Sequence, residues 1–344
     1  MISGINILAY ILLCTTLAHA VPLQLNERRD LAHVIPLRLD KRGGLPAFPI
    51  RLNKRAISQD LLDTFSLYEQ YSAAAYCADN NVPSSNGTAI TCVAGNCPQV
   101  QADGAESVIE FQNIGSGDAT GFVALDHTTQ QIIISFRGSQ SLQNFVADAE
   151  FPLSPSTICT GCEVHTGFLD SWTSVKSLVQ GAVETARTTY PSYGVVSTGH
   201  SLGAALATLA AADLRNGGYG VSLYTYGSPM VGNIALATFI TAQDANFRIT
   251  HANDLVPKLP GYGLGYAHVS PEYWITSATG VVVTVDDVQT SEGVVDVQGN
   301  EGQPGGDLGD HLFYFNEVAA CGPDVLGLEG LVWGGEVEAV QLKL

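Results

Sequence analysis

The sequence predicts an α/β fold, in which helices cover both faces of a mostly parallel sheet. From Ala56 onward, short β-branched runs alternate with longer amphipathic segments, the pattern of strands connected through helices. A serine flanked by glycines, at 199–203, lies between such a strand and such a helix. No shift in composition marks a second domain within this part of the chain.

The expected elements follow one another along the chain. Helices are expected at 61–77, 165–190, 201–215 and near 232–243. Strands are expected at 120–126, 131–137, 193–200, 221–227 and 246–253. Residues 280–310 are rich in Gly, Asp and Gln, and we expect a strand and long loops there.

The first 55 residues are predicted to be removed during secretion. Residues 1–20 contain a short apolar run and end in Ala-His-Ala, as secretory signal peptides do, and the run is too short to span a membrane comfortably. Residues 21–55 repeat a Pro–aliphatic–polar–Leu core with a dibasic end, which indicates a propeptide; a flexible leader without function is the alternative. Residues 56–321 are then the folded domain, and 322–344 form an extension without an assigned role.

The charge of the chain excludes several classes of partner. The net charge is −18, and residues 1–55 contain eight of the 15 basic and three of the 33 acidic side chains, so residues 56–344 carry −23. So acidic a domain is not expected to bind nucleic acid, or anionic membranes by charge. We expect a secreted protein that acts on neutral substrates.

The cysteines indicate disulfides. Of the seven, Cys14 lies in the predicted signal peptide, and the other six allow 15 pairings. Local spacing favours Cys92–Cys97 and Cys159–Cys162, which leaves Cys77–Cys321; a redox or zinc motif at Cys159-x-x-Cys162 is the alternative. Asn86, in Asn-Gly-Thr, is a candidate glycosylation site.

The glycine-flanked serine is the candidate nucleophile. Gly199-His200-Ser201-Leu202-Gly203 matches G-x-S-x-G between a strand and a helix rich in alanine. The tight turn strains the serine backbone and requires glycines two residues away on each side. Ser201 then lies at a helix N-terminus, where N–H groups favour developing negative charge. A plain glycine-rich turn is the alternative.

A serine nucleophile of this kind needs an acid and a base that follow it in the chain. Asp254 comes after the strand at 246–253, and His311 follows a long loop near the end of the domain. His268 is the second candidate base, although a structural role in a loop is expected for it. Asp310 is a poor candidate acid, because the side chains of adjacent residues rarely face each other.

The oxyanion that forms during ester hydrolysis needs two hydrogen-bond donors. One is the backbone N–H of Leu202, the residue after the nucleophile. The other is expected from Ser139, which follows the strand at 131–137.

Several ordered motifs together resemble the fungal class 3 lipase family, the secreted triacylglycerol lipases of filamentous fungi. They include FRGSQSLQNF, CEVHTGFLDSW, TGHSLGAALATLAAADLR, YTYGSPMVGN, FRITHANDLVPKLP, HVSPEYW and DHLFYF. The resemblance runs from about residue 66 to 321. It implies an α/β-hydrolase fold, the triad of Ser201, Asp254 and His311, and an oxyanion hole at Ser139 and Leu202.

The resemblance also implies further parts of the site. Tyr76 matches a tyrosine that lines the family's site, and Leu255, Val256 and Leu259 match the side that holds the acyl chain. The implied chemistry is two-step acyl transfer, which needs no cofactor and no metal. The resemblance further supports the three disulfide pairs given above.

Residues 142–150 occupy the position of the family's lid. The apolar face of this expected helix consists of Leu142, Phe145, Val146 and Ala149. It carries a single aromatic ring, so we expect a lid that requires an oil surface only modestly and a protein that also accepts soluble esters.

The sequence and the resemblance together therefore predict a secreted, monomeric serine hydrolase, a triacylglycerol lipase that acts on acylglycerols or other esters at an oil–water interface. It predicts no integral membrane association. A feruloyl esterase or a broad carboxylesterase is the alternative enzyme. A hydrolase fold without catalysis, used for binding, is the alternative of another class.

Overall fold

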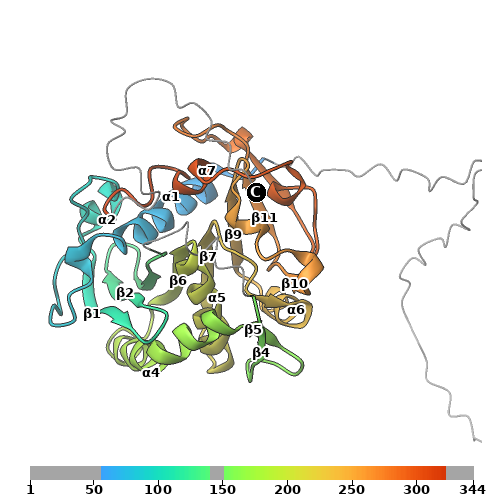
Figure 1. Ribbon diagram of the computed structural model, residues 1–344. Helices are drawn as coiled ribbons and strands as arrows, with labels where there is room; N and C mark the ends of the chain where they lie inside the picture. The colour runs from blue at the N-terminus through green and yellow to red at the C-terminus, as the bar shows by residue number, and fades with distance from the viewer. Residues whose placement is uncertain (1–55, 140–150, 323–344) are drawn as a thin grey trace, which may run out of the picture. The chain divides into compact units, whose positions relative to one another are not determined.

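The computed structural model describes residues 56–139 and 151–322 (Figure 1). The predicted signal peptide and propeptide and nearly all of the C-terminal extension lie outside these ranges. So do the predicted lid residues Leu142, Phe145, Val146 and Ala149.

An eight-stranded sheet forms the centre of the part of the chain that the structure describes, in the order β1-β2-β3-β6-β7-β9-β11-β12. Its strands are β1 (Glu106–Ile114), β2 (Ala119–Asp126), β3 (Gln131–Phe136), β6 (Gly194–His200), β7 (Val221–Tyr226), β9 (Asn246–His251), β11 (Glu272–Ile275) and β12 (Val288–Ser291). Strands β3 through β11 run parallel, while β1, β2 and β12 are antiparallel to their neighbours. The carboxyl ends of the parallel strands therefore share one edge of the sheet.

Helices lie on both faces of this sheet (Figure 1). They are α1 (Gln59–Ala74), α2 (Pro98–Asp103), α4 (Thr166–Thr189), α5 (Leu202–Asn216), α6 (Ile234–Thr241) and α7 (Gly309–Leu312). The start of α1 is fixed by Ser58, whose side chain accepts from the N–H of Leu61. Helix α4 ends just before Pro191, which cannot continue a helix.

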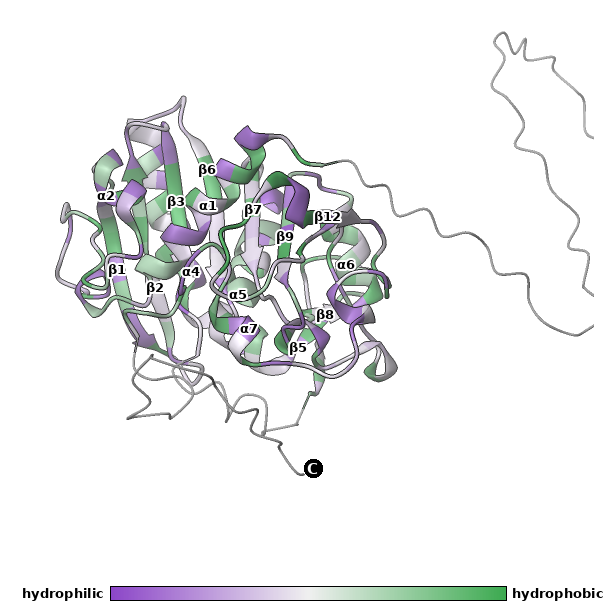
Figure 2. Cartoon of the chain, turned by 90° about the horizontal axis from the view of Figure 1, so that it is seen from above, coloured by the Kyte–Doolittle hydropathy of each residue, from purple (hydrophilic) through white to green (hydrophobic). Residues whose placement is uncertain are grey.

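The core has two halves because successive side chains of a strand point to opposite faces. In β3, Ile132, Ile134 and Phe136 join the cluster under α4 and α5, whereas Ile133 joins the cluster under α1. All four side chains are fully buried. Hydropathy colouring likewise shows apolar residues along β1 and β6 (Figure 2).

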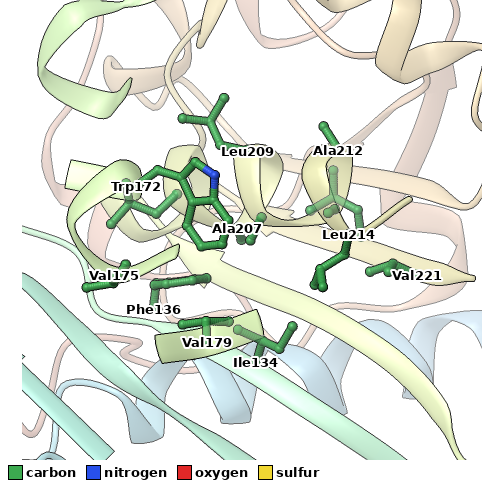
Figure 3. Packing of buried hydrophobic residues seen from close by; sticks show 14 of the residues in the cluster. Ile134, Phe136, Trp172, Val175, Val179, Ala207, Leu209, Ala212, Leu214 and Val221 are labelled. Atoms are coloured by element: carbon green, nitrogen blue, oxygen red, sulfur yellow. The ribbon is translucent and has the colours of Figure 1, made fainter. Parts of the chain in front are cut away.

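Trp172 is the largest side chain in the core between α4, α5 and the sheet (Figure 3). Its ring meets Phe136 edge to face, with 6.2 Å between the ring centroids. Its indole N–H donates to Asp213 on α5 over 2.6 Å, which satisfies the one polar atom that the burial of Trp172 removes from water. The alanines of α5, such as Ala207, allow this close approach.

A second, antiparallel sheet lies beside the main one. In the order β10-β8-β5-β4 it consists of β10 (Tyr266–Ala267), β8 (Gly232–Asn233), β5 (Glu163–His165) and β4 (Leu153–Pro155). The Cys159–Cys162 disulfide closes the turn between β4 and β5.

Two further disulfides involve cysteines that follow α1. Cys92 pairs with Cys97, and Cys77, just after α1, pairs with Cys321. The second bond joins positions 244 residues apart and ties the end of the domain to its first helix. The structure thus contains the pairings that local spacing favoured.

The predicted α/β architecture is confirmed, and the expected helices and strands are present within a few residues of their predicted ends. Strand β1 was not expected. Within the described ranges, no helix combines the length and the apolar character that a membrane span requires.

Candidate active site

Ser201 sits on a strained turn between β6 and α5. Its backbone has φ 58° and ψ −129°, a conformation that residues other than glycine rarely adopt. The flanking glycines are required by contact. A Cβ on Gly199 would lie 2.4 Å from the carbonyl carbon of Gly203, and a Cβ on Gly203 would lie 2.1 Å from the carbonyl oxygen of Phe136.

The two expected oxyanion donors lie on either side of this turn. Leu202 is the first residue of α5, so its N–H has no acceptor within the helix. Residues 137–139 leave β3 and pass next to the nucleophile. A Cβ on Gly138 would lie only 3.1 Å from the Cβ of Ser201. Ser139 follows Gly138 directly, and both Ser139 and Leu202 are partly exposed.

Asp254 and His311 form a buried pair, although 57 residues separate them. The imidazole Nδ1–H of His311 donates to the carboxylate of Asp254 over 2.8 and 3.0 Å. Asp254 is fully buried, and its other donors are the N–H of Val256 and the hydroxyl of Tyr314, at 2.8 and 2.6 Å. The sequence indicated this acid and this base, and the structure brings them together.

Tyr314 and Gly227 complete the surroundings of His311, and neither was expected from the sequence. A Cβ on Gly227 would lie 2.8 Å from two ring atoms of His311 and from the hydroxyl of Tyr314. Burial, and then the carboxylate of Asp254, raises the pKa of Tyr314 well above its usual value, so its hydroxyl remains a donor. The glycine that directly follows β7, in Tyr226-Gly227-Ser228, was the one sequence signal that another group approaches the backbone closely there.

His200 and Tyr76 connect the nucleophile turn to the base. The Nε2 of His200 lies 2.8 Å from the carbonyl oxygen of His311, and its Nδ1 lies 2.7 Å from the Tyr76 hydroxyl. Burial, and then His311, lowers the pKa of His200 well below its usual value. The neutral ring therefore donates from Nε2 and accepts from Tyr76, whose oxygen in turn accepts from the N–H of Gly138.

Two reactive atoms of the site are left without a partner. Neither the hydroxyl of Ser201 nor the Nε2 of His311 makes a hydrogen bond to any of the residues that the structure describes, and both atoms are buried. The rings of His311 and His200 have centroids 4.3 Å apart, so the base lies beside the residue that precedes the nucleophile. A hydroxyl and a free ring nitrogen in this arrangement are suited to proton transfer.

The remaining candidates for acid and base have structural contacts. His268 is buried and donates from Nε2 to the carbonyl of Pro257 over 2.7 Å, as expected for a loop histidine. The carboxylate of Asp310 accepts from the backbone N–H of Asn253 and from the hydroxyl of Thr279. It therefore lies away from His311, its neighbour in the chain.

The residues expected at the substrate pocket differ in how deeply they are buried. Tyr76 is buried and engaged as described above. Val256 is fully buried directly after the acid, whereas Leu255 and Leu259 are partly exposed. The side chain of Leu255 packs against Gly306, where a Cβ would lie 2.5 Å from it.

Comparison with known proteins shows which family the chain belongs to. The family model described as lipase (class 3) matches residues 133–263, and the one described as lipase 3 N-terminal region matches residues 44–107. The secreted mono- and diacylglycerol lipase A of Penicillium camembertii is 44% identical over 278 residues, which are 80% of this chain and 91% of that protein. The secreted mono- and diacylglycerol lipase 1 of Fusarium solani is 40% identical, covering 79% of this chain and 82% of that protein.

The fold is also similar to that of a lipase of known structure. The mono- and diacylglycerol lipase from Aspergillus oryzae superposes with a TM-score of 0.74 at 41% identity, over 77% of this chain and 99% of that one. The shared fold is that of the α/β hydrolases. The chain therefore belongs to the class 3 lipase family and, like these relatives, is a secreted lipase.

Proposed function

We propose that this lipase hydrolyses the ester bonds of acylglycerols through Ser201, His311 and Asp254. The observation that carries the proposal is the buried His311–Asp254 pair, 2.8 Å between Nδ1 and Oδ2, next to the strained turn of Ser201. Asp254 would hold the ring of His311 in the tautomer whose Nε2 accepts a proton.

The reaction proceeds from these roles in two steps. His311 takes the proton of the Ser201 hydroxyl while the serine oxygen attacks the ester carbonyl. The N–H of Leu202 and the donors of Ser139 stabilise the oxyanion, and the alcohol leaves with the proton from His311. Water then attacks the acyl-enzyme, with His311 as base again, and releases the fatty acid.

The test is the substitution Ser201→Ala, measured on an emulsified acylglycerol and on a soluble ester. We expect kcat to fall by about six orders of magnitude with an unchanged thermal transition, because the acyl-enzyme cannot form. A serine-reactive phosphonate should label the wild type and leave the variant unlabelled. Substantial turnover by the purified variant would contradict the assignment, and a wild type that takes no label would favour a binding protein without catalysis.

The acyl substrate is the finer question. The sequence pointed to triacylglycerols, while the relatives named above act, by their names, on mono- and diacylglycerols. We expect the chain to hydrolyse all three, with the higher kcat/KM for mono- and diacylglycerols. Measured beside a soluble cinnamoyl ester, a preference for the latter would instead favour the feruloyl esterase alternative.

The setting of the reaction is also part of the proposal. We expect a monomer that works at an oil–water interface, with a lid at 142–150 that gives modest activation by the interface. Activity below and above the solubility limit of a short-chain acylglycerol measures this. A sharp rise only above that limit would contradict the expected lid, and size-exclusion chromatography with light scattering would reveal a dimer.

Processing of the chain completes the proposal. We expect cleavage after Ala20 and Arg55, and a glycan on Asn86, which is exposed. Mass spectrometry of the secreted protein, before and after glycosidase treatment, would show both. A mature N-terminus upstream of residue 56, or an unmodified Asn86, would contradict the corresponding part.

A further inference from the structure

His251 lies between two backbone carbonyl groups. Its Nδ1 is 2.9 Å from the carbonyl oxygen of Asp310, and its Nε2 is 2.9 Å from that of Ser277. The side chain is fully buried at the carboxyl end of β9. The two carbonyls belong to α7, which carries His311, and to the segment that leaves β11.

The chemistry of imidazole limits what this arrangement can be. A neutral ring has one N–H and one lone pair, and a carbonyl oxygen can only accept a hydrogen bond. With one nitrogen deprotonated, a lone pair would face a carbonyl oxygen in a buried place, which is unfavourable. Both contacts are attractive only when both nitrogens carry a proton, that is, when His251 is a cation.

Other buried histidines of the described chain do not face this constraint. His200 meets one carbonyl and one tyrosine hydroxyl, and the hydroxyl can donate to its second nitrogen. His268 meets one carbonyl through Nε2. Burial lowers the pKa of both well below the usual value, so these two rings are neutral and provide an internal comparison.

Several charged and titratable groups lie in the elements packed around His251. Asp254 follows β9 two residues after Ala252, its backbone N–H donates to the carbonyl of His251, and its buried carboxylate is bonded to no Lys or Arg side chain among the described residues. The ring of Tyr314, whose hydroxyl donates to Asp254, has its centroid 5.7 Å from that of the His251 ring. The other charged and titratable groups near this region are the carboxylate of Asp310, His311 on α7, Glu272 with Arg248, and Lys258, whose Nζ is held by Asn253, Gln303 and Gly305.

We propose that His251, doubly protonated, is a positioning residue for the catalytic base. It ties the carbonyl of Asp310, the residue before His311, to the exit of β11, and so fixes α7 against the carboxyl edge of the sheet. The inference rests on the proposed role of His311. It predicts that the base loses its position when one of the two contacts of His251 is lost.

The first experiment measures protonation directly and needs no activity. In the wild-type protein with ¹⁵N-labelled histidine, the imidazole signals of His251 should show two protonated nitrogens at neutral pH, one for each carbonyl contact. His200 and His268 should show one protonated nitrogen each in the same spectra. A single-tautomer, neutral His251 at neutral pH would overturn the proposal whether or not the protein hydrolyses esters.

The second experiment compares His251→Gln with the matched variant His268→Gln on a soluble short-chain ester. The glutamine amide can donate to one carbonyl while its oxygen faces the other. We expect kcat to fall at least tenfold at neutral pH with KM within about twofold, because the ring of His311 is displaced while substrate binding is kept. His268→Gln should keep the wild-type kcat and KM.

The outcomes separate the two proposals. An unchanged kcat in His251→Gln would overturn the positioning role. A wild type without esterase activity would instead refute the proposed function and leave the protonation result standing. Should His251→Gln fail to fold, the ¹⁵N measurement on the wild type decides alone.

Discussion

Gly227 offers a direct test of how closely His311 is held. The residue comes directly after β7 with φ +57°, and a Cβ there would lie 2.8 Å from the Cε1 and the Nδ1 of His311. The substitution Gly227→Ala must therefore move the ring or the backbone by roughly 0.6 Å to restore an ordinary contact of 3.4 Å. The ring cannot rotate freely, because its Nδ1–H is bonded to Asp254.

Two effects of different size are expected. An alanine at positive φ costs about 1–2 kcal/mol of stability. A misplacement of about 1 Å in a catalytic group can cost about 100-fold in rate, so a shift of roughly half that distance should lower kcat/KM by about 10- to 100-fold. The loss should appear in kcat rather than in KM, because His311 acts on the proton of Ser201 and not on substrate binding.

The assay is steady-state hydrolysis of a soluble ester, with thermal unfolding of the same samples. Gly218→Ala is the matched control, since Gly218 has φ +89° and a Cβ there would meet nothing within 4 Å. It should lose a similar amount of stability and keep full activity. Wild-type kcat/KM in Gly227→Ala, at the temperature where both variants are folded, would refute the view that this glycine is required by contact with the base.

Two further predictions concern stability. Burial raises the pKa of Glu69 on α1 well above its usual value, so the neutral carboxyl stabilises the fold at low pH, and this stability is lost as pH rises through the folded pKa. Glu69→Gln should therefore have nearly the wild-type melting temperature at low pH, and its melting temperature should rise progressively above that of the wild type as pH increases. A difference in melting temperature that stays constant with pH in calorimetry would contradict this. The double variant Cys77→Ser and Cys321→Ser removes the bond that joins positions 244 residues apart in the unfolded chain. It should lower the free energy of unfolding, measured by urea denaturation, by about 2–5 kcal/mol, because the unfolded chain gains conformational freedom. An unchanged free energy of unfolding would show that the disulfide does not restrict the unfolded chain.

The nucleophile turn was the easiest part to predict from the sequence. Ser201 lies in a short continuous pattern of strand, glycine-flanked turn and helix, and every feature of that pattern is local. Asp254 was predictable for a similar reason, because it closely follows a strand and the carboxyl ends of parallel strands share one edge. His311 needed the additional rule that the base follows the acid in the chain.

The groups that hold these residues were not predictable in the same way. The hydroxyl of Tyr314 reaches Asp254 across 60 residues, and the hydroxyl of Tyr76 reaches His200 across 124. A tyrosine in an apolar run has the same local pattern whether it packs or donates. Only the fold determines which polar atom its hydroxyl meets.

Strand β1 was missed for a related reason. Glu110 interrupts its apolar pattern, yet the side chain is buried, with 3% of its surface exposed. The carboxylate accepts from the N–H of Val82 and the hydroxyl of Thr88, which belong to a loop more than 20 residues earlier. A buried acid is tolerated where donors satisfy it, and no local pattern in the strand announces those donors.

The segment that carries His311 has little regular structure of its own, since α7 has only four residues. Side chains from distant elements hold its backbone: His200 and His251 contact the carbonyls of His311 and Asp310. Further along the chain, Asn316 donates to Glu69 on α1, and Cys321 is bonded to Cys77 just after that helix. Each hydrogen bond is worth only about 1–3 kcal/mol, while the core under α4 and α5 does not depend on them. Changes at these contacts should therefore reduce catalysis before they unfold the domain, because they fix the backbone beside the base while the core under α4 and α5 stays intact.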